Sequence, residues 1–398
     1  MRTTNPEQNM NKVKAGDIQS TAVTVTWTPG IQADAIVCTP SAANSSAKTV
    51  TYTLTATDIS SGSATVTGLE PETSYRATLK LGEKTRGYST FTTNLDLRDA
   101  IQLTPTDDWV TAIQDAAAGS KFALAAGEYT LTSAKLQINN NVTIAAQNSG
   151  NLPVINTCIH INNGSSLYLY QVVMDGTGTD GSQAIEYKTA GGFGDLIISG
   201  SEIRNYVKGL IYINVAAVAN TIKIENSIIH DIECSGGDFI DSRSGGWNNL
   251  IISSSTFYSC SAKRDILRAD DASSKVSASM ITSIDKCTFY NVGNGNANYR
   301  FFYLRFPGNT NNVVANFDNT RGFANSTSVG VPSYSNNYYY NCKNLTSQAE
   351  GNTQTNLTCF DTEGNILDKN PFADPDNADF TITDELFQSY GFGDPRWY

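Results

Sequence analysis

The 398-residue sequence predicts an all-β protein in two parts, a small antiparallel sandwich and a longer solenoid of stacked strands. Three observations lead to this prediction. Short runs of alternating apolar and polar residues are separated by Gly, Pro, Ser and Asn turns, which is typical of strands. A ten-residue pattern recurs through the second part at intervals close to one solenoid coil. Only residues 107–119 form a convincing amphipathic helical pattern.

The composition excludes several classes of protein. The formal net charge of −11 argues against nucleic acid as a partner. No apolar run approaches the roughly 18 residues of a membrane-spanning helix. With 7 Cys, 2 His and no Cys-x-x-Cys pair, the chain offers no zinc-ligand spacing. The negative charge is concentrated in residues 350–398, which hold 10 acidic and 2 basic side chains, a net of −8.

The first part, residues 1–94, alternates cleanly over residues 21–27 and 49–55. Trp27 ends the first of these runs, and Gly68-Leu-Glu-Pro-Glu-Thr-Ser-Tyr75 leads into a later strand. This arrangement resembles the fibronectin type III fold. In that family the Tyr hydroxyl pins a strand corner and the Trp packs between two sheets. The resemblance implies a β-sandwich that acts as a spacer, and it indicates no binding site.

The second part, residues 95–398, begins with the helical pattern. Asp107 or Asp108 is expected to cap the helix and Gly119 to end it, with Trp109 and Ile113 on one face. A strand that ends in Gly-Glu-Tyr129 follows. This order resembles the entry to right-handed parallel β-helices of the pectate-lyase type. The resemblance implies an N-terminal capping helix that covers the open end of the hydrophobic core.

An internal repeat supports the solenoid. Copies begin at Leu167, Leu196, Ile222, Leu250 and Thr282, at intervals of 29, 26, 28 and 32 residues. Alignment of the copies predicts an apolar column, a second apolar column, a small-residue column and a polar turn column. These columns are, in that order, Ile203, Ile229, Phe257, Phe289 and Tyr339; Tyr206, Ile232, Cys260, Val292 and Cys342; Ser201, Ser227, Ser255 and Cys287; and Asn205, Asp231, Ser259, Asn291 and Asn341. The cysteines among them are expected to be buried thiols.

The ending of the chain extends the resemblance. Residues 370–382 and 393–397 are similar to the closing segment of pectate-lyase-like β-helices in Bacteroidota polysaccharide-utilisation systems. Such proteins are exported lipoproteins, so the resemblance implies the cell surface or periplasm of a Gram-negative bacterium. Residues 1–13 are polar throughout, so we expect an export signal that is absent from this chain.

A second strand in each coil supplies the candidate site. In the register of the repeat, two outward columns span five coils, or roughly 19 Å at a spacing of about 4.8 Å. Tyr rings stack on sugars, Arg and Lys bind carboxylates or sulfates, and acidic and amide groups accept from hydroxyls. The predicted ligand-binding residues are Glu186, Lys188, Tyr212, Asn214, Asp241, Arg243, Arg268, Asp270, Tyr303 and Arg305.

These residues leave several functions open. The first is a monomeric cell-surface protein that binds an acidic, pectin-like polysaccharide, alongside other outer-membrane glycan-uptake proteins, with no cofactor. The alternative is a polysaccharide lyase that acts by β-elimination, with Lys188, Arg243 or Arg268 as base and calcium near Asp241 and Asp270. A third is an inert stalk whose charges pair across coils, as Asp241 with Arg268.

Hydrolysis has less support in the sequence. Inverting hydrolases of this fold need clustered aspartates for acid and base, and Asp270-Asp271 is the only pair near the outward columns. His160 and His230 are isolated in strand contexts, and we expect both to be structural.

Overall fold

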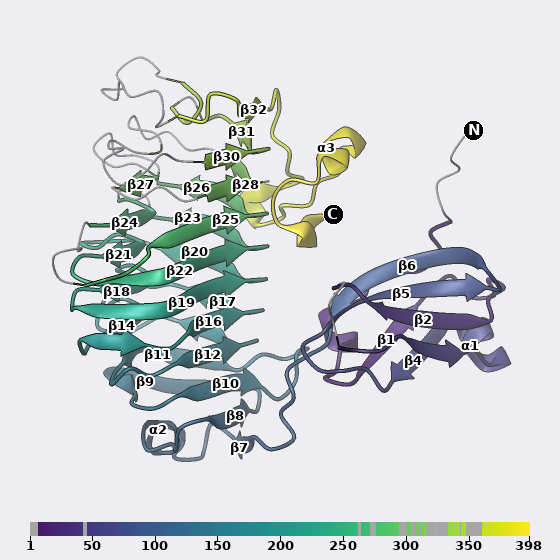
Figure 1. Ribbon diagram of the computed structural model, residues 1–398, viewed down its shortest axis with the longest axis horizontal. Helices are drawn as coiled ribbons and strands as arrows, with labels where there is room; N and C mark the ends of the chain where they lie inside the picture. Colours follow the sequence, from purple (N-terminus) through teal and green to yellow (C-terminus); the bar gives the residue numbers. More distant parts are fainter. Residues whose placement is uncertain are drawn as a thin grey trace. The chain divides into compact units, whose positions relative to one another are not determined.

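A computed structural model describes residues 7–42, 46–261, 264–270, 276–293, 301–303, 308–310, 312–315, 323, 333–342, 344–347 and 360–398 (Figure 1). The chain divides into two compact units. One comprises Met1–Ala100 with Gln147–Asn151, and the other comprises Ile101–Ala146 with Leu152–Tyr398. Among the described residues, no helix has both the length and the apolar character needed to cross a membrane.

The N-terminal unit is built from two antiparallel sheets. Strands β1 and β4 form one, and the other has the order β3-β2-β5-β6. The strands are β1 (Ala22–Thr26), β2 (Ala35–Pro40), β3 (Val50–Thr53), β4 (Ser63–Thr67), β5 (Ser74–Leu81) and β6 (Lys84–Thr92), with helices η1 (Ala15–Asp17) and α1 (Ala56–Ser61). Both sheets contribute to one apolar core that contains Trp27 and Tyr75. The Tyr75 hydroxyl accepts a hydrogen bond of 3.1 Å from the backbone of Glu70.

The second unit is a β-solenoid whose strands stack in three groups, which we name stacks A, B and C (Figure 1). All pairs within the stacks are parallel. Stack A consists of β7 (Ile101–Leu103), β8 (Ser120–Leu124), β10 (Val142–Ala146), β12 (Leu167–Tyr170), β16 (Leu196–Ser199), β19 (Ala217–Glu225), β22 (Gly246–Ser253), β25 (Ile281–Asp285), β28 (Gly308–Thr310) and β30 (Ser333–Ser335), with β15 (Gly191–Phe193) beside β19.

Stacks B and C diverge from one long strand, β11 (Val154–Ile161), which itself pairs with β9 (Glu128–Ile138). The first half of β11 pairs with the start of stack B and its second half with the start of stack C. Stack B consists of β13 (Val173–Asp175), β17 (Glu202–Arg204), β20 (Ile228–Ile232), β23 (Thr256–Cys260), β26 (Thr288–Val292), β29 (Val313–Ala315), β31 (Tyr338–Tyr340) and β32 (Asn365–Ile366). Stack C consists of β14 (Ile185–Tyr187), β18 (Ile211–Ile213), β21 (Ile240–Ser242), β24 (Leu267–Ala269) and β27 (Phe302–Tyr303).

The first predicted apolar column is confirmed by the strand register. Ile203, Ile229, Phe257 and Phe289 are paired in turn across β17, β20, β23 and β26. Val314 then connects this column to Tyr339. The predicted thiols Cys260, Cys287 and Cys342 are buried and form no disulfide.

The helix that opens this unit is shorter than the sequence predicts. Helix α2 spans Trp109–Gln114, with Asp108 as its N-cap. It stops before Gly119 because the chain turns toward β8, and the Gly119 N–H donates to Asn141 instead of to the helix. Trp109 is buried and lies edge-on to Tyr129, with 5.7 Å between the ring centroids.

The chain ends in a small second core that the repeat does not predict. Phe372, Phe380 and Phe387 pack with Tyr290 and Val313 of stack B. The elements of this segment are η3 (Pro375–Asn377), α3 (Glu385–Tyr390) and η4 (Pro395–Trp397). Segment 360–398 therefore covers part of the outward face of stack B.

Candidate ligand-binding face

The predicted outward column lies on stack C in the expected register. Backbone pairing aligns Glu186, Tyr212, Asp241, Arg268 and Tyr303 across successive strands. Four further predicted residues with described side chains follow the ends of these strands: Lys188 after β14, Asn214 after β18, Arg243 after β21 and Asp270 after β24. Arg305 lies outside the described residues, and the description of Tyr303 extends to its backbone alone.

The shortest ion pairs on this face form within one coil. The Lys188 Nζ atom lies 2.9 Å from a Glu186 oxygen, and the Arg268 Nε atom lies 2.7 Å from an Asp270 oxygen. Arg243 pairs in the same way with Asp241. Side chains two residues apart on a strand project from the same side, which places each pair in contact. Among the described residues, the expected ion pair of Asp241 with Arg268 is not found, and Arg243 is the close partner of Asp241. Arg268 instead reaches across coils to Asp238, at 3.8 Å.

Asp241 is also not the exposed residue that the alternation predicts. It is only 1% exposed, because Arg243 lies over its carboxylate. Its Oδ2 atom accepts from the Arg243 Nη2 atom at 3.1 Å and from the backbone of Asp238 at 3.2 Å. Asp241 thus supports Arg243 and is closed to a ligand.

Asp238, which lies outside the repeat and was not predicted from it, is covered by the arginines. Its carboxylate is fully buried. The nearest guanidinium nitrogens are those of Arg243 at 3.1 Å, Arg264 at 3.3 Å and Arg268 at 3.8 Å. The backbone N–H of Asp265 donates to the same carboxylate at 3.2 Å. One buried carboxylate therefore organises side chains from two coils.

The electrostatics of this cluster keep the arginines charged. Burial and the charge of Asp241 raise the pKa of Asp238, while Arg264 and Arg243 oppose the rise. Burial by itself lowers the pKa of Arg243, but the hydrogen bond and charge of Asp241 raise it overall. Asp270 likewise raises the pKa of Arg268 against the effect of burial. Both guanidiniums are thus held as cations.

Both histidines contact carboxylates, in agreement with a structural role. The His160 Nε2 atom lies 3.5 Å from Glu186. His230 lies between Glu202, at 3.1 Å from its Nε2 atom, and Asp231, at 2.6 Å from its Nδ1 atom. Its ring stacks on Tyr258 with a centroid distance of 4.6 Å.

Comparisons with known proteins leave the activity of the chain open. Residues 127–260 match a family described as a domain of unknown function, DUF4957, and residues 282–397 match another, DUF5123. No curated protein matches the chain. A family 28 exopolygalacturonase of Yersinia enterocolitica is a similar solved structure, with 12% identity over 84% of this chain and 86% of the other, and a TM-score of 0.27. The catalytic domain of a GH87 alpha-1,3-glucanase variant in complex with nigerose shows 11% identity over 85% of this chain and 91% of the other, and a TM-score of 0.28.

Proposed function

We propose that the outward face of stack C binds a polysaccharide. The observation that carries the proposal is the fixed position of Arg243 above two buried aspartates. Its Nε and Nη2 atoms donate to Asp241 and Asp238, and its Nη1 atom makes no hydrogen bond within the described residues. The Arg243 side chain remains 28% exposed. A guanidinium that is already held in place loses less conformational entropy when it binds a ligand.

Tyr212 completes the surface that we name the arginine face, which consists of Tyr212, Arg243 and Arg268. Tyr212 is paired in register with Asp241, and Asp241 is paired in turn with Arg268, so Tyr212 and Arg268 lie two coils apart. The Arg268 side chain is 23% exposed. An aromatic ring beside forked N–H donors suits a sugar that carries a carboxylate, since the ring stacks on the sugar and the donors bind the anion. The ligand that we propose is an acidic, pectin-like glycan.

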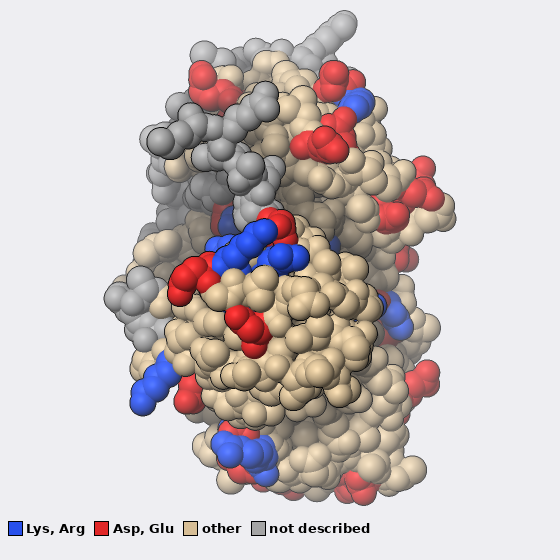
Figure 2. Space-filling view, turned by 90° about the vertical axis from the view of Figure 1, so that its right-hand side faces the viewer, with Lys and Arg blue, Asp and Glu red and all other residues tan. Residues whose placement is uncertain are grey.

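Local contacts, and not a broad positive field, have to supply this affinity. The whole chain carries a net charge of −11. Within stack C the basic side chains are matched by acidic ones, since Lys188 pairs with Glu186 and Arg268 with Asp270. On the side drawn in Figure 2, which lies to the right in Figure 1 and is not the face of stack C, basic and acidic side chains also lie in small groups among uncharged ones. An acidic polymer is therefore expected to bind through a few charged hydrogen bonds.

The state of the arginines favours binding over β-elimination with Arg243 or Arg268 as the base. A lyase needs a base that can lose its proton to accept one from the sugar. Asp241 and Asp270 hold Arg243 and Arg268 in the protonated form. Neither guanidinium is therefore suited to act as the base.

The remaining parts of the proposal concern the setting of this face. We propose that the solenoid is a right-handed β-helix capped by α2 and that the N-terminal unit is a fibronectin type III-like spacer. The hydrogen bond from the Glu70 backbone to Tyr75 supports the second assignment. Export to a Gram-negative cell surface, with a lipid anchor, completes the proposal.

The test uses the full chain in affinity gels that contain polygalacturonan, galactan or no polysaccharide. We expect polygalacturonan to retard the protein and Arg268→Ala and Tyr212→Ala to reduce retardation several-fold. Arg98→Ala and Tyr168→Ala are matched controls from other surfaces and should migrate as the wild type does. Unchanged retardation in both face variants would place the site elsewhere. Release of unsaturated uronates from the polymer would show that the protein is a polysaccharide lyase and not a non-catalytic binder.

A further inference from the structure

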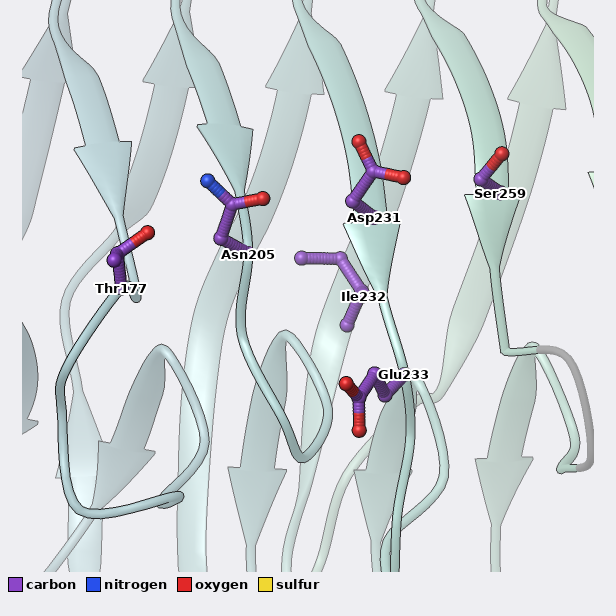
Figure 3. Close-up of a pocket in the computed structure, with 6 residues that line it drawn as sticks. All are labelled: Thr177, Asn205, Asp231, Ile232, Glu233 and Ser259. Carbon is purple, nitrogen blue, oxygen red and sulfur yellow. The ribbon is translucent and has the colours of Figure 1, made fainter.

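Stack B carries a separate hollow at the turns that follow its strands. The hollow has a volume of about 540 Å³ and lies among residues from successive coils (Figure 3). This volume falls within the range of small-molecule sites. Its lining residues are Thr177, Asn205, Asp231, Ile232, Glu233 and Ser259. We name it the turn hollow, and none of its residues belongs to the arginine face.

The backbone explains why polar side chains meet there. Asn205, Asp231 and Ser259 occupy the same turn in three coils, with φ values of 62°, 53° and 53°. This left-handed conformation is one that Asn and Asp adopt more readily than most residues. Figure 3 shows these side chains in one row with Thr177, and Glu233 to one side of the row, below Asp231 and Ile232. The repeat thereby builds a row of polar groups along the solenoid.

The contacts of these side chains leave mainly acceptors for a ligand. The Asn205 Nδ2 and the Thr177 hydroxyl both donate to Asp175, at 3.1 and 2.6 Å. The Asn205 carbonyl oxygen is thus left for other donors. Asp231 uses one oxygen on His230 and retains the other. The Glu233 carboxylate has no hydrogen-bond donor within the described part of the chain.

This chemistry selects the class of ligand. Carboxylate and amide oxygens require a donor-rich partner, and two carboxylates repel an anion. Among the described residues, no group of three His, Cys, Asp or Glu side chains is arranged to hold a metal ion. A sugar with free hydroxyl groups supplies several donors without a charge. We propose that the turn hollow binds a neutral saccharide, through Asn205, Asp231 and Glu233.

The proposal does not rest on the function assigned to the arginine face, because the ligand is neutral and the site lies on another stack. The test is saturation-transfer NMR of the full chain with methyl α-D-galactopyranoside, methyl α-D-glucopyranoside and galacturonic acid. At least one neutral glycoside should receive saturation, and galacturonic acid should receive less. Glu233→Ala should lower the transfer at least three-fold, whereas Arg268→Ala should leave it unchanged.

Two further variants sharpen the result. Glu363→Ala removes an exposed acidic side chain elsewhere in the same unit and should behave as the wild type does. Glu233→Gln keeps an acceptor and removes the charge, so it should retain part of the neutral signal and increase that of galacturonic acid. The proposal is wrong if neither neutral glycoside receives saturation, if Glu233→Ala equals the wild type, or if calcium chloride displaces the glycoside through a Glu233-dependent site.

Discussion

Arg243 donates from Nε and Nη2 to the two oxygens of Asp241, so two residues of one coil form a bidentate pair. Asp241 in turn accepts from the backbone of Asp238, whose carboxylate is buried. The outermost side chain of the three is the arginine. Its orientation on the surface is therefore set by groups that a ligand does not reach.

The first prediction concerns Asp238. Asp238→Ala removes the buried carboxylate that Arg243 and Arg264 share, and loss of one partner of a buried ion pair costs about 3–5 kcal/mol. The free energy of unfolding, measured with urea, should fall by an amount of this order. Asp368→Ala removes an exposed carboxylate and is the matched control. Equal midpoints for wild type and Asp238→Ala would show that the cluster does not stabilise the fold.

The second prediction tests the register of stack C. Ile240 is 1% exposed, whereas Asn214 is exposed one coil away. Ile240→Asp places an unpaired carboxylate in the core, at a cost of several kcal/mol, a large part of the stability of a domain. Circular dichroism and limited proteolysis should show that this substitution unfolds the solenoid. Asn214→Asp introduces the same residue outside the core and should remain folded; similar behaviour of the two variants would refute the register.

The third prediction concerns the hydroxyl ladder between coils. The Ser227 hydroxyl accepts from the backbone of Ser201 at 3.2 Å and donates to Glu225 at 2.7 Å. Ser227→Ala leaves a buried N–H without this acceptor, at a cost of about 1–3 kcal/mol. Thermal denaturation should show a lower Tm for Ser227→Ala than for Ser253→Ala, which changes a partly exposed serine of stack A. Equal Tm values for the two variants would show that the hydroxyl ladder does not stabilise the fold.

Much of the solenoid could be predicted because its coils repeat. The apolar positions recur once per coil, so Ile203, Ile229 and Phe257 could be aligned from the sequence alone. Asp238 could not be found in this way. It lies in the irregular segment between β20 and β21, where no period indicates which side chains are covered. The burial of Asp241 depends on that same segment, and alternation along a strand does not contain this information.

The fourth prediction concerns His230. Burial by itself lowers the pKa of His230, but its hydrogen bonds to Glu202 and Asp231 raise it above 6.5. Arg204 also contacts Glu202, and Tyr258, with a pKa of about 12, stays neutral near pH 7. Because the folded pKa exceeds the unfolded value, the stabilisation is complete below about pH 6.5 and is lost as the pH rises through the folded pKa.

His230→Gln isolates this contribution. The difference in unfolding free energy between wild type and His230→Gln should be largest in mildly acidic buffer and should shrink as the pH rises toward 9. Urea denaturation at a series of pH values measures it. A difference that grows with pH would mean that the neutral imidazole, and not the cation, is the stabilising form.

The last prediction separates charge from stacking on the arginine face. Arg268 contributes a charged donor, and loss of one charged hydrogen bond costs on the order of 1.5–3 kcal/mol. Tyr212 contributes a ring whose stacking on a sugar depends little on salt.

If the glycan is acidic, added sodium chloride screens the partly exposed arginine and weakens retention of the wild type moderately. Arg268→Ala should then bind less tightly at low salt and respond less to added salt. Tyr212→Ala should bind less tightly with the same salt response as the wild type. Affinity gels of polygalacturonan at a series of salt concentrations measure both effects. Retention of the wild type that is insensitive to salt would show that the charge of Arg268 does not contribute to binding of the acidic glycan.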